Sequence, residues 1–94
     1  MALKKFIIER DIPEVGTFDD SQFAGAAETS NAALCEIGAK DIQWVNSFVA
    51  ADKTFCVYLA ADEDAIRKHS EISGFPANKI TEIVEVIDPT TAAQ

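Results

Sequence analysis

Basic side chains are scarce in this sequence of 94 residues, which has 8 lysines and arginines against 16 aspartates and glutamates and a formal net charge of −8. Nucleic acids and anionic membranes are bound mainly through clusters of lysine and arginine, and the sequence contains no such cluster. Its longest apolar run, Phe55 to Ala61, is far shorter than the ~20 residues of a membrane-spanning helix. We therefore expect a cytoplasmic protein without nucleic-acid or membrane partners.

Cysteine, histidine and glycine are also rare, with two cysteines, one histidine and four glycines. No secretion signal is recognisable, and Cys35 and Cys56 do not form a CxxC pair, so we expect two free thiols in a reducing compartment. The sequence also lacks a glycine-rich phosphate loop and the serine elbow of the α/β-hydrolases. These absences exclude the commoner enzyme classes.

What is present is a series of apolar segments separated by cap and turn residues. One helix face is predicted from apolar or small residues at spacings of three and four, namely Phe23, Ala27, Ser30, Leu34 and Ile37. Asp62 and Gly74 have the character of the N-cap and the C-terminal glycine of a second helix. In chain order, the patterns predict a strand over Lys4 to Glu9, a helix between the N-cap Thr17 and Gly38, a hairpin of two strands over Ile42 to Ala51 and Thr54 to Ala60, a helix between Asp62 and Gly74, and a strand over Ile80 to Ile87.

This order of elements, βαββαβ, is typical of an α+β ferredoxin-like sandwich, in which a four-stranded antiparallel sheet carries two helices on one face. A parallel α/β unit is the alternative, but two helices are too few to cover both faces of a parallel sheet. We expect residues 1–94 to form a single domain with a loose tail over residues 89–94.

Alternation along the strands sorts the side chains into two faces. The face expected beneath the helices carries Phe6, Ile8, Trp44, Phe48, Phe55, Val57, Leu59, Val84 and Val86. The opposite face is mixed and carries Ile7, Glu9, Val45, Ser47, Val49, Cys56, Tyr58, Ile83, Glu85 and Ile87. Because a small domain has nothing left to cover these aliphatic side chains, we expect a second copy to pack against them as a homodimer. A single β-bulge would exchange the two sets.

The mixed face contains a candidate site. If Glu9, Cys56, Tyr58 and Glu85 line a cavity between two sheets, low dielectric would raise the pKa of a carboxyl group there and suit it to general-base chemistry. The alternative is that Glu9 pairs at the rim with Arg10 or with a lysine of the partner copy, that Tyr58 is an amphipathic packing residue and that Glu85 is solvated.

His69 and Trp44 are two further candidates. His69, the only imidazole, can act as a base or as a metal ligand that recruits other donors, or it can be a packing residue of the second helix. Trp44 can bound an apolar pocket, although a tryptophan near Phe48 and Phe55 is more often part of a core.

Several segments together are similar to a known family, namely Glu9-Arg10 with Ile12-Pro13, Trp44 to Val49, Lys53 to Tyr58, Ala65 to His69, Gly74 to Ile80 and Ile87 to Ala92. Over nearly the whole chain, the sequence resembles the small bacterial ferredoxin-like family of unknown function that includes a nickel-binding protein. The resemblance implies a fold that dimerises as an α/β barrel, and a divalent transition metal such as nickel. Relatives often carry a histidine where this chain has Asn46, whose amide oxygen is a poorer nickel donor than an imidazole. Alternation places Asn46 on the face of Trp44, where it could meet His69, so these two residues are the candidate metal-binding pair.

Three functions follow from these patterns. The first is a dimeric binding protein that holds a divalent metal or a small ligand between or beside its sheets, with Glu9, Trp44, Asn46, Cys56, Tyr58 and His69 as candidate contacts. The second is a cofactor-independent enzyme of the dimeric-barrel type, an oxygenase or isomerase, with Glu9 or His69 as its base. The third is a structural or regulatory interaction module whose interior is only a core.

Overall fold

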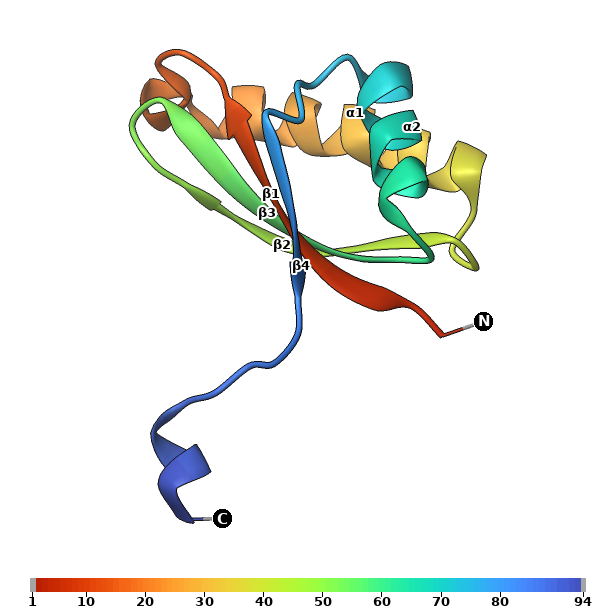
Figure 1. The fold of residues 1–94 in the computed structure, drawn as a ribbon. Helices are drawn as coiled ribbons and strands as arrows, with labels where there is room; N and C mark the ends of the chain where they lie inside the picture. Colours follow the sequence, from red (N-terminus) through yellow and green to blue (C-terminus); the bar gives the residue numbers. More distant parts are fainter. Residues whose placement is uncertain (1, 94) are drawn as a thin grey trace.

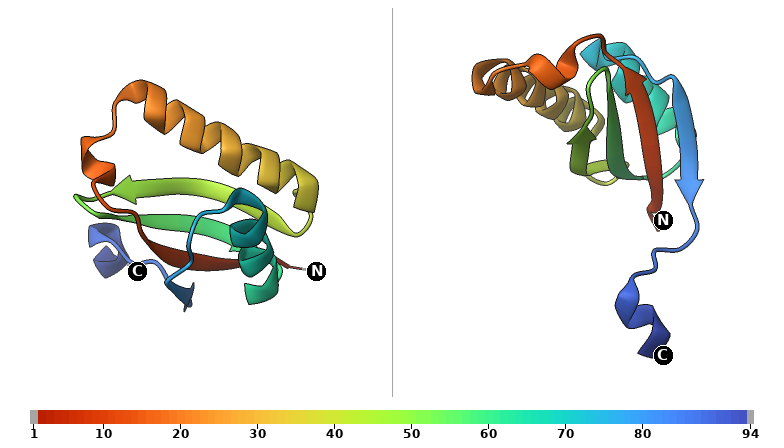
Figure 2. Two further views of the ribbon diagram at one scale, coloured as in Figure 1. Left: turned by 90° about the horizontal axis from the view of Figure 1, so that it is seen from above. Right: turned by 90° about the vertical axis from the view of Figure 1, so that its left-hand side faces the viewer.

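Four antiparallel strands form one sheet, and both long helices lie on the same face of it (Figures 1 and 2). The computed structural model describes residues 2–93, so Met1 and Gln94, the ends of the predicted domain and tail, lie outside the described residues. The elements are β1 (Lys4–Asp11), the 3-10 helix η1 (Val15–Thr17), α1 (Asp20–Ile37), β2 (Ile42–Val49), β3 (Lys53–Ala60), α2 (Glu63–Ser73), β4 (Lys79–Ile83) and the 3-10 helix η2 (Pro89–Ala93). The strand order is β2-β3-β1-β4, which confirms the predicted ferredoxin-like α+β fold.

The helix ends follow local hydrogen bonding. α1 begins after Asp19, not at Thr17, because the Thr17 hydroxyl donates to the Glu14 carbonyl within the η1 turn. The Asp19 carboxylate accepts from the Gln22 N–H, and the Gln22 side chain accepts from the Asp19 N–H, which forms a capping box. Asp62 caps α2 as predicted, by accepting from the Ala65 N–H.

The two inner strands bury alternate side chains beneath the helices, but the prediction was right for only one of them. In β1, Phe6 and Ile8 are buried against the helices as expected. In β3 the prediction was wrong, since Cys56 and Tyr58 are buried there and pair with Ile8 and Phe6 in the sheet. The β3 residues that were expected beneath the helices lie on the opposite, open face, and these are Phe55, Val57 and Leu59.

A β-bulge at Val45 changes the facing of β2. Trp44 pairs with Tyr58, yet Asn46 pairs with Val57, so Val45 is the extra residue between them. Trp44 keeps its predicted place on the helix side, but beyond the bulge Asn46 and Phe48 lie on the open face, and Phe48 is 59% exposed. The predicted shared face of Trp44 and Asn46 is therefore wrong. Two other β2 residues expected on the mixed face, Ser47 and Val49, lie on the helix side instead.

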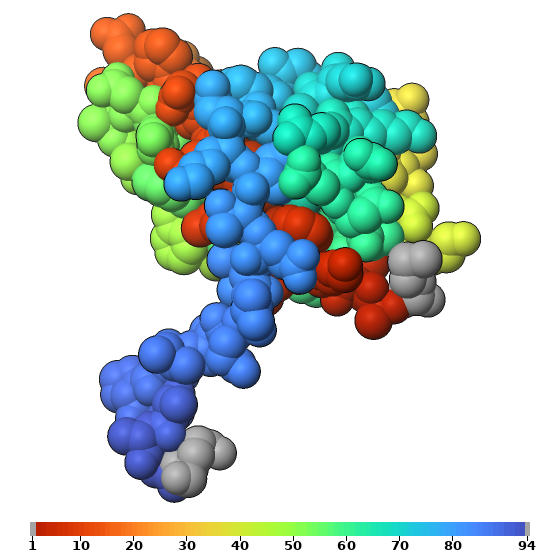
Figure 3. Space-filling view, in the orientation of Figure 1, coloured from red at the N-terminus to blue at the C-terminus, as the bar shows by residue number. Residues whose placement is uncertain are grey.

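The C-terminal segment leaves the body of the molecule after β4 (Figures 1 and 3). β4 ends at Ile83, and Val84 and Val86, predicted to lie beneath the helices, are 92% and 62% exposed. The chain then forms η2, whose first turn is held by the Asp88 carboxylate, which accepts from the Thr90 N–H. Among residues 2–93, no helix combines the length and apolar character needed to cross a membrane.

Candidate functional site

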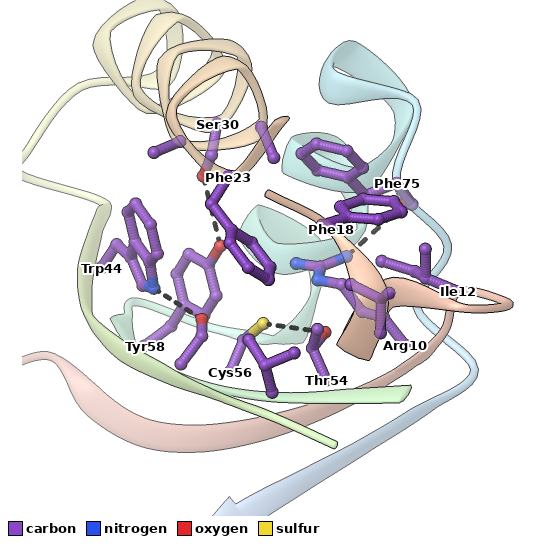
Figure 4. A pocket seen from close by; sticks show the side chains of 15 residues that line it. Arg10, Ile12, Phe18, Phe23, Ser30, Trp44, Thr54, Cys56, Tyr58 and Phe75 are labelled. Atoms are coloured by element: carbon purple, nitrogen blue, oxygen red, sulfur yellow. Dashed lines mark hydrogen bonds between the residues drawn. The ribbon is translucent and has the colours of Figure 1, made fainter. Parts of the chain in front are cut away.

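A pocket of about 460 Å³ lies between α1 and the helix-facing side of the sheet (Figure 4). α1 contributes its small residues Ala26, Ala27 and Ser30, whose short side chains leave open space above the strands. The remaining walls come from β1, the η1 turn, the ends of β2 and β3, and the loop after α2. Five aromatic side chains line it, namely Phe18, Phe23, Trp44, Tyr58 and Phe75. The arrangement gives an apolar cleft of the size that small-molecule sites usually have, ~300–1,000 Å³.

Trp44, Cys56 and Tyr58, three of the sequence-predicted candidates, meet in this pocket. The Trp44 indole is stacked with the Tyr58 ring, with centroids 6.4 Å apart, and its Nε1–H donates to the Ser47 hydroxyl at 3.0 Å. These contacts fix the indole as a wall of the pocket. The bulge at Val45 is what brings Trp44 and Ser47 to the same side.

Four buried polar side chains, those of Arg10, His69, Ser30 and Tyr58, form a chain of contacts at the pocket wall, and all but His69 line the pocket. His69 Nε2 lies 3.0 Å from Ser30 Oγ, and Ser30 Oγ lies 3.4 Å from the Tyr58 hydroxyl. On its other side, His69 Nδ1 lies 3.5 Å from Arg10 Nη2. Because a guanidinium only donates, Nδ1 must accept, and Nε2 then carries the proton that it donates to Ser30.

The surroundings of His69 and Tyr58 keep both side chains neutral. Burial, with the charge of Arg10 as a second cause, lowers the pKa of His69 from 6.5 to about 4. Burial raises the pKa of Tyr58, against the opposing effects of Ser30 and Arg10. At neutral pH these four side chains therefore carry one charge, on the guanidinium of Arg10.

Arg10 and Ser30 are site residues that the sequence reasoning missed. Arg10 continues the series of Phe6 and Ile8 at every second residue of β1, which placed it on the helix-facing side. A charged side chain at a core position of a strand could thus have indicated a site residue. Ser30 was assigned correctly to the inner face of α1, but as a packing residue.

The other candidate residues lie elsewhere. Glu9 is on the open face, where its carboxylate pairs with Lys53 Nζ of the same chain at 3.2 Å and not with Arg10. Glu85 lies beyond the end of β4 and is exposed. The grouping of Glu9, Cys56, Tyr58 and Glu85 on one face was therefore wrong, since only Cys56 and Tyr58 lie together.

Asn46 and His69 are not brought together. Asn46 is exposed on the open face, whereas His69 is 0% exposed on the helix side of the sheet. Both His69 nitrogens already face partners. Within residues 2–93, no three histidine, cysteine, aspartate or glutamate side chains are grouped so that they could hold a metal ion.

Known proteins resemble this chain in sequence and in fold. Residues 6–83 match the family described as "Nickel responsive protein SCO4226-like". The crystal structure of SCO4226 from Streptomyces coelicolor A3(2) has a similar fold, with a TM-score of 0.72 and 14% sequence identity over 88% of this chain and 99% of that chain. No curated protein matches this chain significantly. Because the family match spans most of the sequence, the chain belongs to the nickel-responsive SCO4226-like family.

Proposed function

We propose that this protein is a homodimeric, non-enzymatic binding protein that holds a small, mainly apolar molecule in the pocket between α1 and the sheet. The observation that carries the proposal is the pocket itself, about 460 Å³ with five aromatic side chains in its walls. Most of the surface that lines this cleft is apolar, with a few polar groups among its walls, which is the usual character of a small-molecule site.

Binding is favoured over proton-transfer catalysis by the charge state of the buried polar chain. A general base works best when its pKa lies near the pH of the reaction. The pKa of His69 is lowered to about 4 and that of Tyr58 is raised, so both groups are moved away from neutrality. Glu9, the other proposed base, lies on the opposite face of the sheet and is paired with Lys53.

The family name raises the question of nickel. Nickel is bound well by imidazole nitrogens and cysteine thiolates, usually from several side chains at once. The donors of a single copy do not fit such a site, because the described residues contain no group of three and His69 is enclosed by Arg10 and Ser30. A nickel ion would need donors from two copies of the chain, and we assign no metal to the pocket.

The test of ligand binding is to fill the pocket. In Ala27→Trp, an indole replaces a methyl group in the α1 wall, so we expect binding of the neutral fluorescent probe N-phenyl-1-naphthylamine to weaken at least tenfold. Fluorescence titration measures it. Ala32→Trp, on the exposed side of α1, is the matched control and should bind as the wild type does. Absence of probe binding by the folded wild-type protein would refute the proposal.

The second copy is expected on the open face of the sheet. Ile7, Val57 and Leu59 are only half-buried there, and Phe48 is 59% exposed. On the same face, the charges of Lys53 and Glu9 neutralise each other in an ion pair of 3.2 Å. An apolar surface of this kind is typical of an interface, and a face-to-face pair of sheets would cover it.

Val57→Glu tests this arrangement. A carboxylate at the centre of the open face would be buried without a partner in the dimer, so we expect the variant to sediment as a monomer at concentrations where the wild type is a dimer. Asn31→Glu, on the exposed surface of α1, adds the same charge and should remain dimeric. A monomeric wild-type protein at high concentration would contradict the proposed dimer.

A further inference from the structure

Arg10 is a buried cation without an anion. Its side chain is on the helix-facing side of β1, and the residue is 2% exposed. The ion pairs among the described residues join Lys53 to Glu9 and Asp11, and Arg67 to Glu63, and none includes Arg10. An unpaired buried charge is costly, and arginine cannot lose its proton to avoid that cost.

The groups around the guanidinium are all uncharged. Nη1 donates to the Pro76 carbonyl at 2.8 Å and to the Ser70 hydroxyl at 3.1 Å, with the Phe75 carbonyl at 3.5 Å. Nη2 lies 3.5 Å from the neutral imidazole of His69. These contacts hold the guanidinium in place by one edge. Nε makes no hydrogen bond to the described residues, and because none of their fully buried side-chain nitrogens lacks a partner, Nε is open to the pocket or to solvent.

The guanidinium lines the pocket. It shares the pocket lining with the rings of Phe18, Phe23 and Phe75, and Figure 4 draws it on the side of the pocket away from Trp44. Its carbon also lies 5.8 Å from the centroid of the Tyr58 ring. A molecule in the pocket would therefore meet apolar walls over most of its surface, with five aromatic side chains among them, and one fixed cation at one end.

We propose that the pocket is selective for a monocarboxylate with an aromatic or branched apolar body, whose carboxylate pairs with Arg10. This inference rests on the proposed ligand-binding function and specifies the class of ligand. Arginine presents paired N–H donors that match the two oxygens of a carboxylate, and such a pair is strongest where water is excluded. The ligand would supply the anion that the chain itself does not place beside Arg10.

The experiment compares two ligands of the same shape and different charge. Calorimetric titration with 2-naphthoate and with its neutral amide, 2-naphthamide, should show at least tenfold tighter binding of the carboxylate to the wild-type protein. In Arg10→Met, which keeps the apolar stem, the ratio of the two affinities should fall to about one. Arg67→Met removes an equal charge from an exposed pair on α2 and should keep the wild-type ratio.

The outcomes separate this inference from the proposed function. Equal affinities for the two ligands in the wild type would overturn the carboxylate selectivity while leaving ligand binding intact. No binding of either ligand or of N-phenyl-1-naphthylamine would overturn both. Circular dichroism checks that Arg10→Met is folded, and if it is not, Arg10→Ala and the wild-type ratio itself provide the decision, since a ratio below tenfold refutes the proposal without any variant.

Discussion

Lowering the pH from 7 to 4 should destabilise this protein by up to about 3 kcal/mol through His69 alone. The pKa of His69 is lowered from 6.5 to about 4 in the folded protein, chiefly by burial and then by the charge of Arg10. Between these two pH values the unfolded chain binds a proton that the folded protein does not bind, so the free energy of unfolding falls as the pH falls. The full pKa difference corresponds to roughly 3–4 kcal/mol at ~1.4 kcal/mol per unit, of which about 3 kcal/mol is lost by pH 4.

The pH window makes the prediction specific. This stability is nearly all present at pH 7, is lost steadily as the pH falls from 6.5 to about 4, and falls only a little further below pH 4, where the folded imidazole is already half protonated. Urea unfolding at a series of pH values measures it. His69→Gln keeps a polar side chain that can donate and accept but cannot titrate, so its stability between pH 7 and 4 should fall by about 3 kcal/mol less than that of the wild type. Parallel pH profiles for the two proteins would contradict the buried neutral imidazole.

The order of the elements could be predicted because the ends of the helices are marked locally. Asp62 accepts the Ala65 N–H at the start of α2, and Gly38 and Gly74 have positive φ angles of 103° and 82° at the helix ends. The inner face of α1 was also predictable, since Ser30 and Ala33 are the buried residues of that helix and Phe23 and Leu34 lie beside them. Each of these signals depends on a few neighbouring residues.

The facing of β3 could not be predicted because both of its faces are apolar. Cys56 and Tyr58 are no more hydrophobic than Phe55 and Val57, so alternation alone gives no preference. The choice is made by partners distant in the sequence: Tyr58 turns toward α1, where its hydroxyl lies 3.4 Å from Ser30 Oγ. The candidate site was therefore predicted on the wrong face of the sheet, because Cys56 and Tyr58 were expected to face away from the helices.

The bulge at Val45 and the role of Arg10 were hidden for related reasons. A bulge leaves no reliable mark in a strand as short as β2, yet it moves every later side chain to the other face. Asn46 was thereby displaced from the pocket and Ser47 was brought into it. The inward position of Arg10 could be predicted from the alternation in β1, but its lack of an acidic partner is a property of the folded structure.

Gly16→Ala is expected to be the other strongly destabilising change. Gly16 packs the η1 turn against the loop between β2 and β3, and its N–H donates to the Ala51 carbonyl at 2.9 Å. A Cβ atom at this position would lie 2.8 Å from the Ala50 carbonyl oxygen and 2.9 Å from the Ala51 Cα. Both are backbone atoms, so the turn or the hairpin loop must move, at a cost of roughly 1–3 kcal/mol.

The same substitution elsewhere in the chain provides the control. Gly25 lies in α1, and a Cβ atom there would meet no atom within 4 Å. Gly25→Ala should therefore stabilise the protein by about 0.5–1 kcal/mol, the usual gain in a helix interior. Urea unfolding should give Gly16→Ala a lower free energy of unfolding than the wild type and Gly25→Ala a higher one.

Because η1 contributes the buried Val15 to the pocket wall, a shift of this turn should also weaken binding of N-phenyl-1-naphthylamine in Gly16→Ala but not in Gly25→Ala. If Gly16→Ala were as stable as the wild type and bound the probe unchanged, the contact between the η1 turn and the hairpin loop would not be needed to hold the pocket in shape.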